Sequence, residues 1–315
     1  MDGQAILALS RIPDQPGIAA RLFETLSDAG INVDLIIQAT HEGTSNDITF
    51  TVNEPDLDQA REVTQSVLNS LGGELSSEGG LTKLSISGAG IMGRPGIAAS
   101  LFNGLCQQGI NLRLIATSEV KVSCVIAATS GRKALQAVRD AFEVADSQVA
   151  INPPLSGEDE PEVRGVALDR DQVQLSVRHV PDRPGIAAAL CSSLADNSIS
   201  IDAIVQSERQ HADGSRDISF ILRKDDRARA DVALAPLLAQ WPGAALEDGD
   251  AIARVSAVGA GMRATAGTAG RMFRALADAQ INIGLIATSE IRTSCVVAEE
   301  NLSLIHISEP TRLGF

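Results

Sequence analysis

The sequence contains four copies of one pattern, and this internal repetition constrains the fold more than any other feature. The string DQPGIAA at residues 14–20 returns as DRPGIAA at 182–188, with RPGIAA at 94–99 between them and a degenerate TAGTA at 265–269. A strand-like segment that begins with isoleucine starts 14 residues after the glycine of each copy. Four copies with the same inner spacing predict four structural units of one kind.

The four copies alternate between two types. The first and third carry Asp-x-Pro-Gly and later Asp-Ile-x-Phe, at residues 47–50 and 217–220. The second and fourth carry Gly-Ala-Gly and later Ile-Ala-Thr-Ser-Glu, at residues 115–119 and 286–290. This alternation indicates that a pair of units was itself duplicated. We therefore expect two pairs, the first unit with the second and the third with the fourth.

Each unit is predicted to run strand, helix, strand, strand, helix. In the first unit Ile6 to Leu9 form an apolar strand, and a helix is expected to begin at Pro16, because proline suits the first helical turn. Apolar residues at positions 18, 22 and 26 share one helix face, and Gly30 ends the helix. Residues 31–38 alternate apolar and polar, which predicts a half-buried second strand.

The repeat boundaries define the predicted domains. We expect repeat 1 at residues 1–78, repeat 2 at 79–151, a linker at 152–171, repeat 3 at 172–250 and a truncated repeat 4 at 251–300. The linker is predicted from two consecutive prolines and an acidic run in a segment of low apolar content. Residues 301–315 show no counterpart of the last helix of repeat 2, and we expect them to be a non-native tail.

The charge balance excludes several classes of partner. With 26 Lys and Arg against 40 Asp and Glu, the formal net charge is −14, so nucleic acids and anionic membranes are poor partners. No apolar run reaches the roughly 18 residues of a membrane-spanning helix, and the first residues lack the basic start of a signal peptide. The four cysteines form no Cys-x-x-Cys pair and are expected to be small buried hydrophobes. We predict a cytoplasmic protein without a metal site.

Catalytic patterns are weak in this sequence. Residues 88–93 match the dinucleotide fingerprint Gly-x-Gly-x-x-Gly, but Arg94-Pro95-Gly96 separate them from the following helix, which disfavours nucleotide binding. We find no nucleophile with a neighbouring base and no lysine-bearing phosphate loop. The sequence therefore predicts no catalytic residues and no cofactor within this chain.

The Pro-Gly loops have the chemistry of a binding site for an α-amino acid. The first N–H groups of the helix after Pro16 lack partners within the helix and suit a carboxylate. Asp14 can accept hydrogen bonds from an ammonium group, and Asn32, Asp34 and Gln38 offer further polar contacts. The set returns at Asp182, Gly185, Asp202 and Gln206, with Ser200 in place of Asn32. The alternative is that the aspartates only cap turns and solvate a sheet edge.

These motifs resemble the regulatory region of monofunctional aspartate kinases. The resemblance rests on the Asp-x-Pro-Gly-Ile-Ala loop, Ile-Asn-Val-Asp at residues 31–34, Asp-Ile-Thr-Phe, Gly-Ala-Gly-Met and Ile-Ala-Thr-Ser-Glu, and it covers residues 5 to about 298. It implies an α+β fold of four ferredoxin-like ACT units, each βαββαβ with antiparallel sheets, in two pairs, as in the duplicated cyanobacterial-type enzymes. The catalytic domain, which would bind ATP and Mg, is absent from these residues.

The resemblance also implies that lysine or threonine binds between paired ACT units. One site would use Asp14, Pro16, Gly17, Ile18, Ala19, Asn32, Val33, Asp34 and Gln38, completed by Asn111, Leu112 and Ser118. The other would use Asp182, Gly185, Ile186, Ala187, Ser200, Ile201, Asp202 and Gln206, completed by Asn282, Ile283 and Ser289. The implied partners are lysine or threonine, a kinase domain of the same or a sister chain, and a second copy in a homodimer. A separately translated regulatory subunit and a purely structural oligomerisation module are the alternatives.

Overall fold

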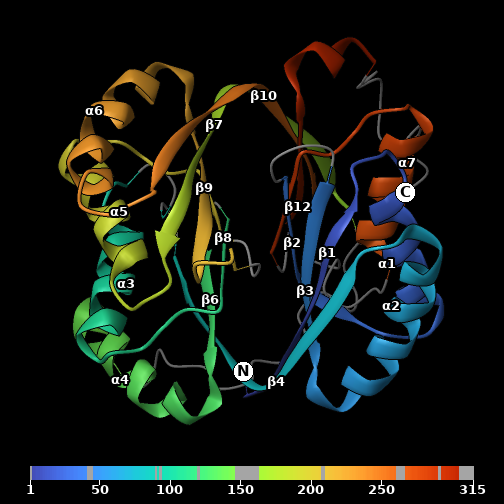
Figure 1. The fold of residues 1–315 in the computed structure, drawn as a ribbon, viewed down its shortest axis with the longest axis horizontal. Coiled ribbons are helices and arrows are strands. Elements are labelled where there is room, and N and C mark those ends of the chain that lie inside the picture. Colours follow the sequence, from blue (N-terminus) through green and yellow to red (C-terminus); the bar gives the residue numbers. More distant parts are fainter. Residues whose placement is uncertain are drawn as a thin grey trace. The chain divides into compact units, whose positions relative to one another are not determined.

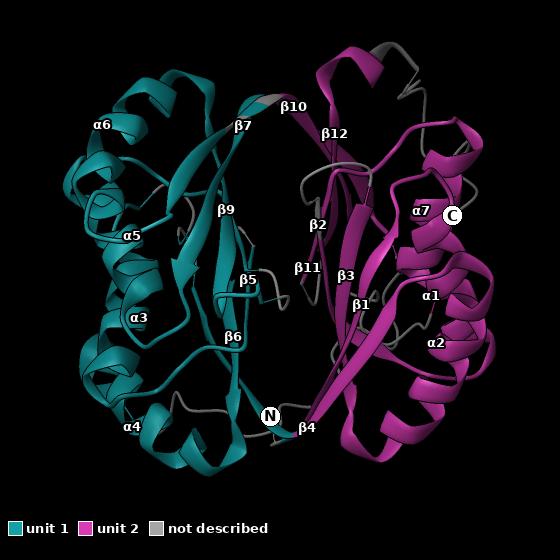
Figure 2. Cartoon of the chain, viewed as in Figure 1, with its two compact units in different colours: residues 1–3, 80–153, 171–250 teal, residues 4–79, 154–170, 251–315 magenta. Residues whose placement is uncertain are grey.

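The computed structural model describes residues 2–40, 45–88, 91, 94–118, 121–145, 163–206, 210–259, 267–289 and 292–304. The chain divides into two compact units, shown in different colours in Figure 2. Unit 1 comprises residues 1–3, 80–153 and 171–250, and unit 2 comprises residues 4–79, 154–170 and 251–315. Most strands and helices of both units are labelled in Figure 1, and β5 and β11 are labelled in Figure 2.

Unit 2 contains repeats 1 and 4. Its strands form one antiparallel sheet in the order β1-β3-β2-β11-β12-β10. The strands are β1 (Asp2–Pro13), β2 (Val33–Thr40), β3 (Ser45–Asn53), β10 (Ala245–Val258), β11 (Leu285–Ser289) and β12 (Arg292–Ala298). The helices are α1 (Ile18–Asp28), α2 (Leu57–Leu71) and α7 (Thr268–Asp278).

Unit 1 contains repeats 2 and 3 and is built in the same way. Its sheet runs β7-β9-β8-β5-β6-β4 and is again antiparallel. The strands are β4 (Glu74–Ser87), β5 (Leu114–Ser118), β6 (Lys121–Ala127), β7 (Gly165–Pro181), β8 (Ala203–Gln206) and β9 (Ser215–Arg223). The helices are α3 (Ile97–Gln107), α4 (Gly131–Phe142), α5 (Ile186–Asp196) and α6 (Arg227–Leu238). The four repeats, each built of helices and antiparallel strands, confirm the predicted fold class.

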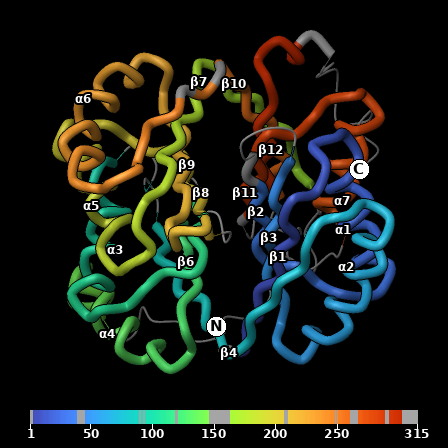
Figure 3. Tube along the Cα trace, viewed as in Figure 1, coloured from blue at the N-terminus to red at the C-terminus, as the bar shows by residue number. Residues whose placement is uncertain are grey.

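The predicted pairing of the repeats is wrong. Repeat 1 pairs with repeat 4 through β2 and β11, with Gln38 opposite Ile286. Repeat 2 pairs with repeat 3 through β5 and β8, with Ala116 opposite Val205. The alternation of motif types requires an odd repeat beside an even one, and both arrangements satisfy it. The chain changes unit within β1, β4, β7 and β10, and also between residues 153 and 154. Its course can be followed along the trace in Figure 3.

Each interface within a unit is also covered by a pair of helices. In unit 2, α1 packs on α7, where the Phe23 and Phe273 rings meet edge to face at 5.6 Å and Arg274 Nε donates to Glu24 Oε1 at 2.9 Å. In unit 1, α3 packs on α5, and Asn103 Nδ2 donates to Ser192 Oγ at 3.1 Å. Strand pairing and helix packing therefore join the same two repeats in each unit.

The first helix begins later than predicted. Gly17 stands at its N-terminal cap in the left-handed region, with φ of 94°, and α1 starts at Ile18 rather than at Pro16. A residue with a side chain rarely adopts this φ, which explains why glycine follows the proline. At the other end Gly30, with φ of 74°, lies just past the helix, as expected.

Burial agrees with the predicted helix faces but not with the second strand. Leu22, Phe23 and Leu26 of α1 are buried in a core that also contains Phe50. In β2, however, residues 35–38 are all buried, so the predicted half-buried alternation is wrong. Residues 36–38 pair with β3 in regular register, so their burial means that both faces of the strand are buried there.

Two of the predicted boundaries, those of the linker and of the C-terminal tail, can be compared with the structure. β7 begins at Gly165, so residues 165–171 are strand rather than linker, and residues 146–162 lie outside the described part. After β12 the chain forms a short 3-10 segment, Glu299–Leu304. The expected non-native tail lies from residue 305 onward outside the described residues. Within the part of the chain that the structure describes, no helix is long and apolar enough to cross a membrane.

Candidate functional site

The two Asp-x-Pro-Gly loops open a helix without capping it. Gly17 and Gly185 occupy the N-terminal caps of α1 and α5 with φ of 94° and 98°, and no side chain makes a capping hydrogen bond at either position. In α5 the N–H of Ile186 donates to the Arg183 carbonyl at 3.4 Å. The remaining N–H groups of the first turn of each helix have no acceptor within the helix, and the helix dipole adds partial positive charge there. Each loop is a suitable place for a carboxylate when other groups complete the site.

The first loop lies in unit 2, beside a hollow that we call the Asp14 site. Residues from β1, α1, β2, β3 and repeat 4 line it. They are Ile12, Pro13, Gln15, Pro16, Gly17, Ile18, Ala19, Ala20, Gln38, Asn46, Ile48, Phe273, Ile281, Asn282 and Ile283. The lining is apolar apart from the amides and the loop backbone. Asp14 is not itself among the lining residues, but its hydrogen-bond partners Asn46 and Asn282 are.

Two amides hold the Asp14 carboxylate. Asn46 Nδ2 of β3 and Asn282 Nδ2 of repeat 4 both donate to Asp14 Oδ1 at 2.6 Å. The buried Oδ1 of Asn46 has no hydrogen-bond partner among the described residues. Gln38 Nε2 donates to the carbonyl of Ile283 at 2.5 Å. The Asp14 site thus has a carboxylate whose only described partners are neutral, and a spare acceptor on Asn46.

The equivalent hollow in unit 1 is called the Asp182 site. Residues of β7, α5, β8, β9 and repeat 2 line it. They are Phe102, Ile110, Asn111, Leu112, Val180, Pro181, Asp182, Arg183, Pro184, Gly185, Ile186, Ala187, Ala188, Gln206, Arg216 and Ile218. The backbone framework matches that of the Asp14 site, with Asn111 in the place of Asn282 and Arg216 in the place of Asn46.

Charge distinguishes the Asp182 site from its counterpart. Arg216 Nε donates to Asp182 Oδ2 at 2.8 Å, and this guanidinium is only 4% exposed. Gln210 Nε2 donates to the same oxygen at 2.7 Å, and Asn111 Nδ2 donates to Oδ1 at 3.0 Å. Burial raises the pKa of Asp182, but the Asn111 hydrogen bond and the Arg216 charge together lower it below its ordinary value.

The structure exchanges the residues that were expected to complete each site. Asn282 and Ile283 meet the Asp14 loop, whereas Asn111 and Leu112 meet the Asp182 loop, which reverses the predicted assignment. The reason is the observed pairing of repeat 1 with repeat 4 and of repeat 2 with repeat 3. The side chains of Ser118 and Ser289, which were predicted to contribute, lie outside the described part.

Several residues at the start of the second strands do not line the two sites. Ile201 and Asp202 line a separate hollow with residues 94–99 of repeat 2, rather than the Asp182 site. Asn32, Val33 and Asp34 do not line the Asp14 site, and the carbonyl of Asp34 accepts from Thr288 Oγ1 of repeat 4 at 3.5 Å. Ser200 precedes Ile201 and does not line the Asp182 site. The predicted set around Asp182 therefore combined residues of two hollows, and the set around Asp14 included three residues that do not line the Asp14 site.

Sequence reasoning did not identify Asn46, Arg216 or Gln210. Asn46 and Arg216 each precede the aspartate of the Asp-Ile-x-Phe motif, so the repeat alignment places them at equivalent positions. Their role follows from the antiparallel pairing that sets Asn46 opposite Ile12 and Arg216 opposite Val180. The signal was present in the aligned repeats, but its meaning required the strand register.

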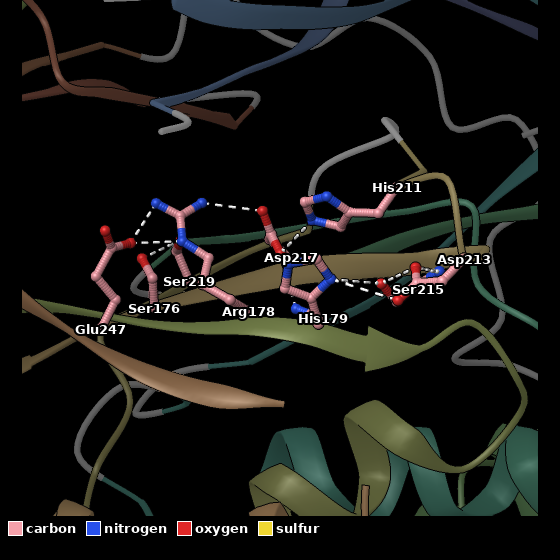
Figure 4. A network of polar contacts seen from close by, with 9 residues as sticks. All are labelled: Ser176, Arg178, His179, His211, Asp213, Ser215, Asp217, Ser219 and Glu247. Atoms are coloured by element: carbon pink, nitrogen blue, oxygen red, sulfur yellow. Dashed lines mark hydrogen bonds and ion pairs between the residues drawn. The ribbon is translucent and has the colours of Figure 1, made fainter. Parts of the chain in front are cut away.

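A polar network in unit 1 joins side chains of β7, β9 and β10 and includes Asp217, the residue after Arg216 (Figure 4). The His179 and His211 rings stack with centroids 3.9 Å apart, and His211 Nε2 is 2.9 Å from Asp217 Oδ1. Arg178 pairs with Asp217 at 2.9 Å and also with Glu247. This network fixes the end of β9 on which Arg216 stands.

The cysteines and the possible metal ligands are further candidates for a site among the described residues. Cys124, Cys191 and Cys295 are buried, and burial raises the pKa of the Cys124 thiol to about 12, as expected for inert core residues. Cys106 is half-buried. Among the described residues, no group of three or more His, Cys, Asp and Glu is arranged to hold a metal ion.

Comparison with known proteins agrees with this architecture. Two family models described as ACT domain match residues 7–69 and 173–239, and residues 84–142 and 255–304, which together exceed half of the chain. The crystal structure of aspartate kinase from Synechocystis is 44% identical with a TM-score of 0.91, over 97% of this chain and 54% of that chain.

Curated relatives show similarity over shorter stretches of the chain. An aspartokinase of Thermus thermophilus is 40% identical over 142 residues, which is 44% of this chain and 35% of the relative. An aspartokinase of Helicobacter pylori is 42% identical over 137 residues, which is 44% of this chain and 33% of the relative. The chain thus spans about half of the Synechocystis enzyme, and the match covers about a third of each curated relative.

Proposed function

Because this chain belongs to the ACT-domain family and matches the regulatory regions of aspartate kinases, we propose that its Asp14 site binds an amino-acid effector that regulates such a kinase. The whole enzyme would phosphorylate aspartate with ATP, and the kinase domain would belong to the same or a sister chain. This chain matches about half of the Synechocystis enzyme, which supports a regulatory region that acts on a separate kinase domain.

The geometry of the Asp14 site carries the proposal. An α-amino acid presents an ammonium group and a carboxylate a few ångströms apart. The Asp14 carboxylate and the unpartnered Oδ1 of Asn46 are acceptors for the ammonium, whereas the uncapped start of α1 at Gly17 supplies donors for the carboxylate. The hollow is lined mainly by apolar side chains, among them Phe273 and Ile48, which suits contact with a largely apolar stem.

Regulation requires that the bound state differ from the free state. The Asp14 site is built from repeats 1 and 4, because Asn282 donates to Asp14 and the Ile283 carbonyl accepts from Gln38. An effector that contacts both repeats favours the arrangement in which they meet, and an effector shifts an equilibrium only by such a difference in affinity. Lysine and threonine are the effectors we propose, acting in the cytoplasm on a homodimeric enzyme.

Titration calorimetry on the full chain tests the proposal. We expect lysine or threonine to bind at concentrations up to a few millimolar, and the Nα-acetylated form of the same amino acid to fail, because it lacks the ammonium group. Absence of binding by both amino acids to a folded chain would contradict the proposal and leave a structural oligomerisation role. Equal binding of the acetylated form would contradict the assignment of Asp14 to the ammonium.

A further inference from the structure

The two sites differ at one strand position, whose side chain contacts the loop aspartate in both units. β3 and β9 are equivalent, and their second residues are Asn46 and Arg216. Both side chains reach the loop aspartate of their own unit, Asn46 to Asp14 at 2.6 Å and Arg216 to Asp182 at 2.8 Å. The same place is thus filled by a neutral amide in one unit and by a cation in the other.

This exchange changes what is left for a ligand. An asparagine has both a donor and an acceptor, and the acceptor of Asn46 is buried and without a partner in the described part of the chain. An arginine has only donors and carries a permanent positive charge. At the Asp182 site, a ligand ammonium would therefore meet a carboxylate already paired with Arg216 and hydrogen-bonded by Gln210 and Asn111.

We propose that the residue at this position makes the two effector sites unequal: Asn46 leaves the Asp14 site able to bind an ammonium group, whereas Arg216 occupies that place at the Asp182 site and weakens amino-acid binding there. Arg216 is then an internal substitute for the ligand cation. The inference rests on the proposed function, because it concerns the same class of ligand.

The burial of the ion pair supports an internal substitute rather than a flexible surface contact. The side chains of Arg216 and Asp182 are 4% and 9% exposed. The neighbouring His211, Arg178 and Asp217 network holds the same end of β9 (Figure 4). A ligand ammonium must displace a buried, positioned guanidinium to reach Asp182, and such a contact is stronger than one between neutral groups.

Exchange of the two residues tests the proposal, with lysine and threonine as calorimetric probes of the full chain. In an Asp14→Ala background, which leaves the Asp182 site to be measured by itself, Arg216→Asn should tighten binding by about 10- to 100-fold. In a second background, Asp182→Asn, the substitution Asn46→Arg should weaken binding at the Asp14 site by a similar factor.

The chain supplies matched controls at the far ends of the same strands. Asn53 and Arg223 close β3 and β9 and carry the same pair of residue types at exposed positions. Asn53→Arg and Arg223→Asn should leave both affinities unchanged. Thermal unfolding of every variant shows which of them fold, and Asn46→Arg decides the question if Arg216→Asn does not fold.

The outcomes separate this inference from the proposed function. Loss of binding on Arg216→Asn would mean that Arg216 contacts the ligand, and unchanged affinity in both exchange variants would mean that the position does not matter; either result overturns the inference and leaves the proposed function in place. Absence of lysine and threonine binding in the unmodified chain overturns both.

Discussion

The Asp14 and Asp182 sites use one backbone plan with different electrostatics. In each, a left-handed glycine opens a helix without a side-chain cap, and an asparagine from another repeat donates to the loop aspartate. In unit 2 the aspartate is held by amides, and in unit 1 it is held by a buried arginine as well. The comparison shows that duplication preserved the frame of the site while one substitution redirected its charge.

The difference also separates two roles for an aspartate. Asp182 belongs to a buried ion pair, so its loss leaves an arginine without its counter-charge. Asp14 contacts two neutral amides, so its loss removes a charge that only a ligand would use. Stability and affinity measurements on equivalent variants can therefore sharpen or break the comparison.

The largest effect is expected from loss of the ion pair. Asp182→Ala should destabilise unit 1 by about 3–5 kcal/mol, because breaking a buried pair leaves an uncompensated charge. Asp14→Ala should cost less, about 1.5–3 kcal/mol, because this carboxylate accepts its hydrogen bonds from neutral amides and leaves no buried cation behind. Urea unfolding of the two variants gives the comparison. Equal losses of stability would show that Arg216 does not depend on Asp182.

The second prediction concerns affinity. Asp14→Ala should weaken lysine or threonine binding by about 10- to 100-fold, because a charge-assisted hydrogen bond contributes roughly 1.5–3 kcal/mol. Calorimetry measures the affinity, and the melting temperature of the same variant shows whether the fold is retained. Unchanged affinity with a clear loss of stability would mean that Asp14 only caps the loop.

The third prediction compares the two loop glycines. Alanine at a left-handed position costs roughly 1–2 kcal/mol, so Gly17→Ala should destabilise unit 2 by about that amount. Gly185→Ala should cost more, because its Cβ would lie 2.8 Å from Cys106 Sγ, whereas a Cβ at Gly17 would lie 3.7 Å from Ala277 Cβ. Combining Gly185→Ala with Cys106→Ala should recover the excess.

Thermal or urea unfolding of the three variants tests this ranking. A Gly17→Ala chain that is less stable than the Gly185→Ala chain would contradict it. Absence of recovery in the double variant would show that the thiol is not the obstacle.

The smallest effect is expected from pH. The folded-state pKa of Asp182 lies below its ordinary value, so its ionisation stabilises the fold above the unfolded pKa of about 4, and this contribution is lost as pH falls through the folded pKa. The stability difference between the unmodified chain and Asp182→Asn should therefore be largest near neutral pH and shrink below about pH 4. A difference that stays constant from pH 7 to pH 3 would contradict the role of the ionised carboxylate.

Local features of the fold were predictable because they depend on neighbouring residues. Periodicity placed Leu22 and Leu26 on the buried face of α1, and Gly30 at the end of that helix. The start of the helix was misplaced by two residues, because a proline is compatible with the first turn whether or not a left-handed glycine follows it. The predicted alternation in β2 failed because both faces of the strand are buried at residues 36–38, which only the tertiary structure reveals.

The candidate site was predictable only in part. The loops around Asp14 and Asp182 were identified because four aligned repeats reveal them, and Asn282 and Asn111 were recognised as partners of some loop. Their assignment failed because an odd repeat can pair with either even repeat under the same pattern. The role of Arg216 could not be predicted for a related reason. Its contact with Asp182 joins β9 to the loop after β7, and it depends on how these two strands pair.

The sequence by itself determined the number of repeats, the kind of unit and the chemistry of the loops, since helix ends, glycine conformations and apolar periodicity are short-range properties of the chain. Only the tertiary structure decided that repeat 1 pairs with repeat 4 and repeat 2 with repeat 3, and therefore which asparagine reaches which aspartate. Edge pairing of β2 with β11 joins residues about 250 positions apart, and no local preference distinguishes it from the alternative. Packing of complete sheets and helices makes that choice, and with it the placing of Asn46 at one site and Arg216 at the other.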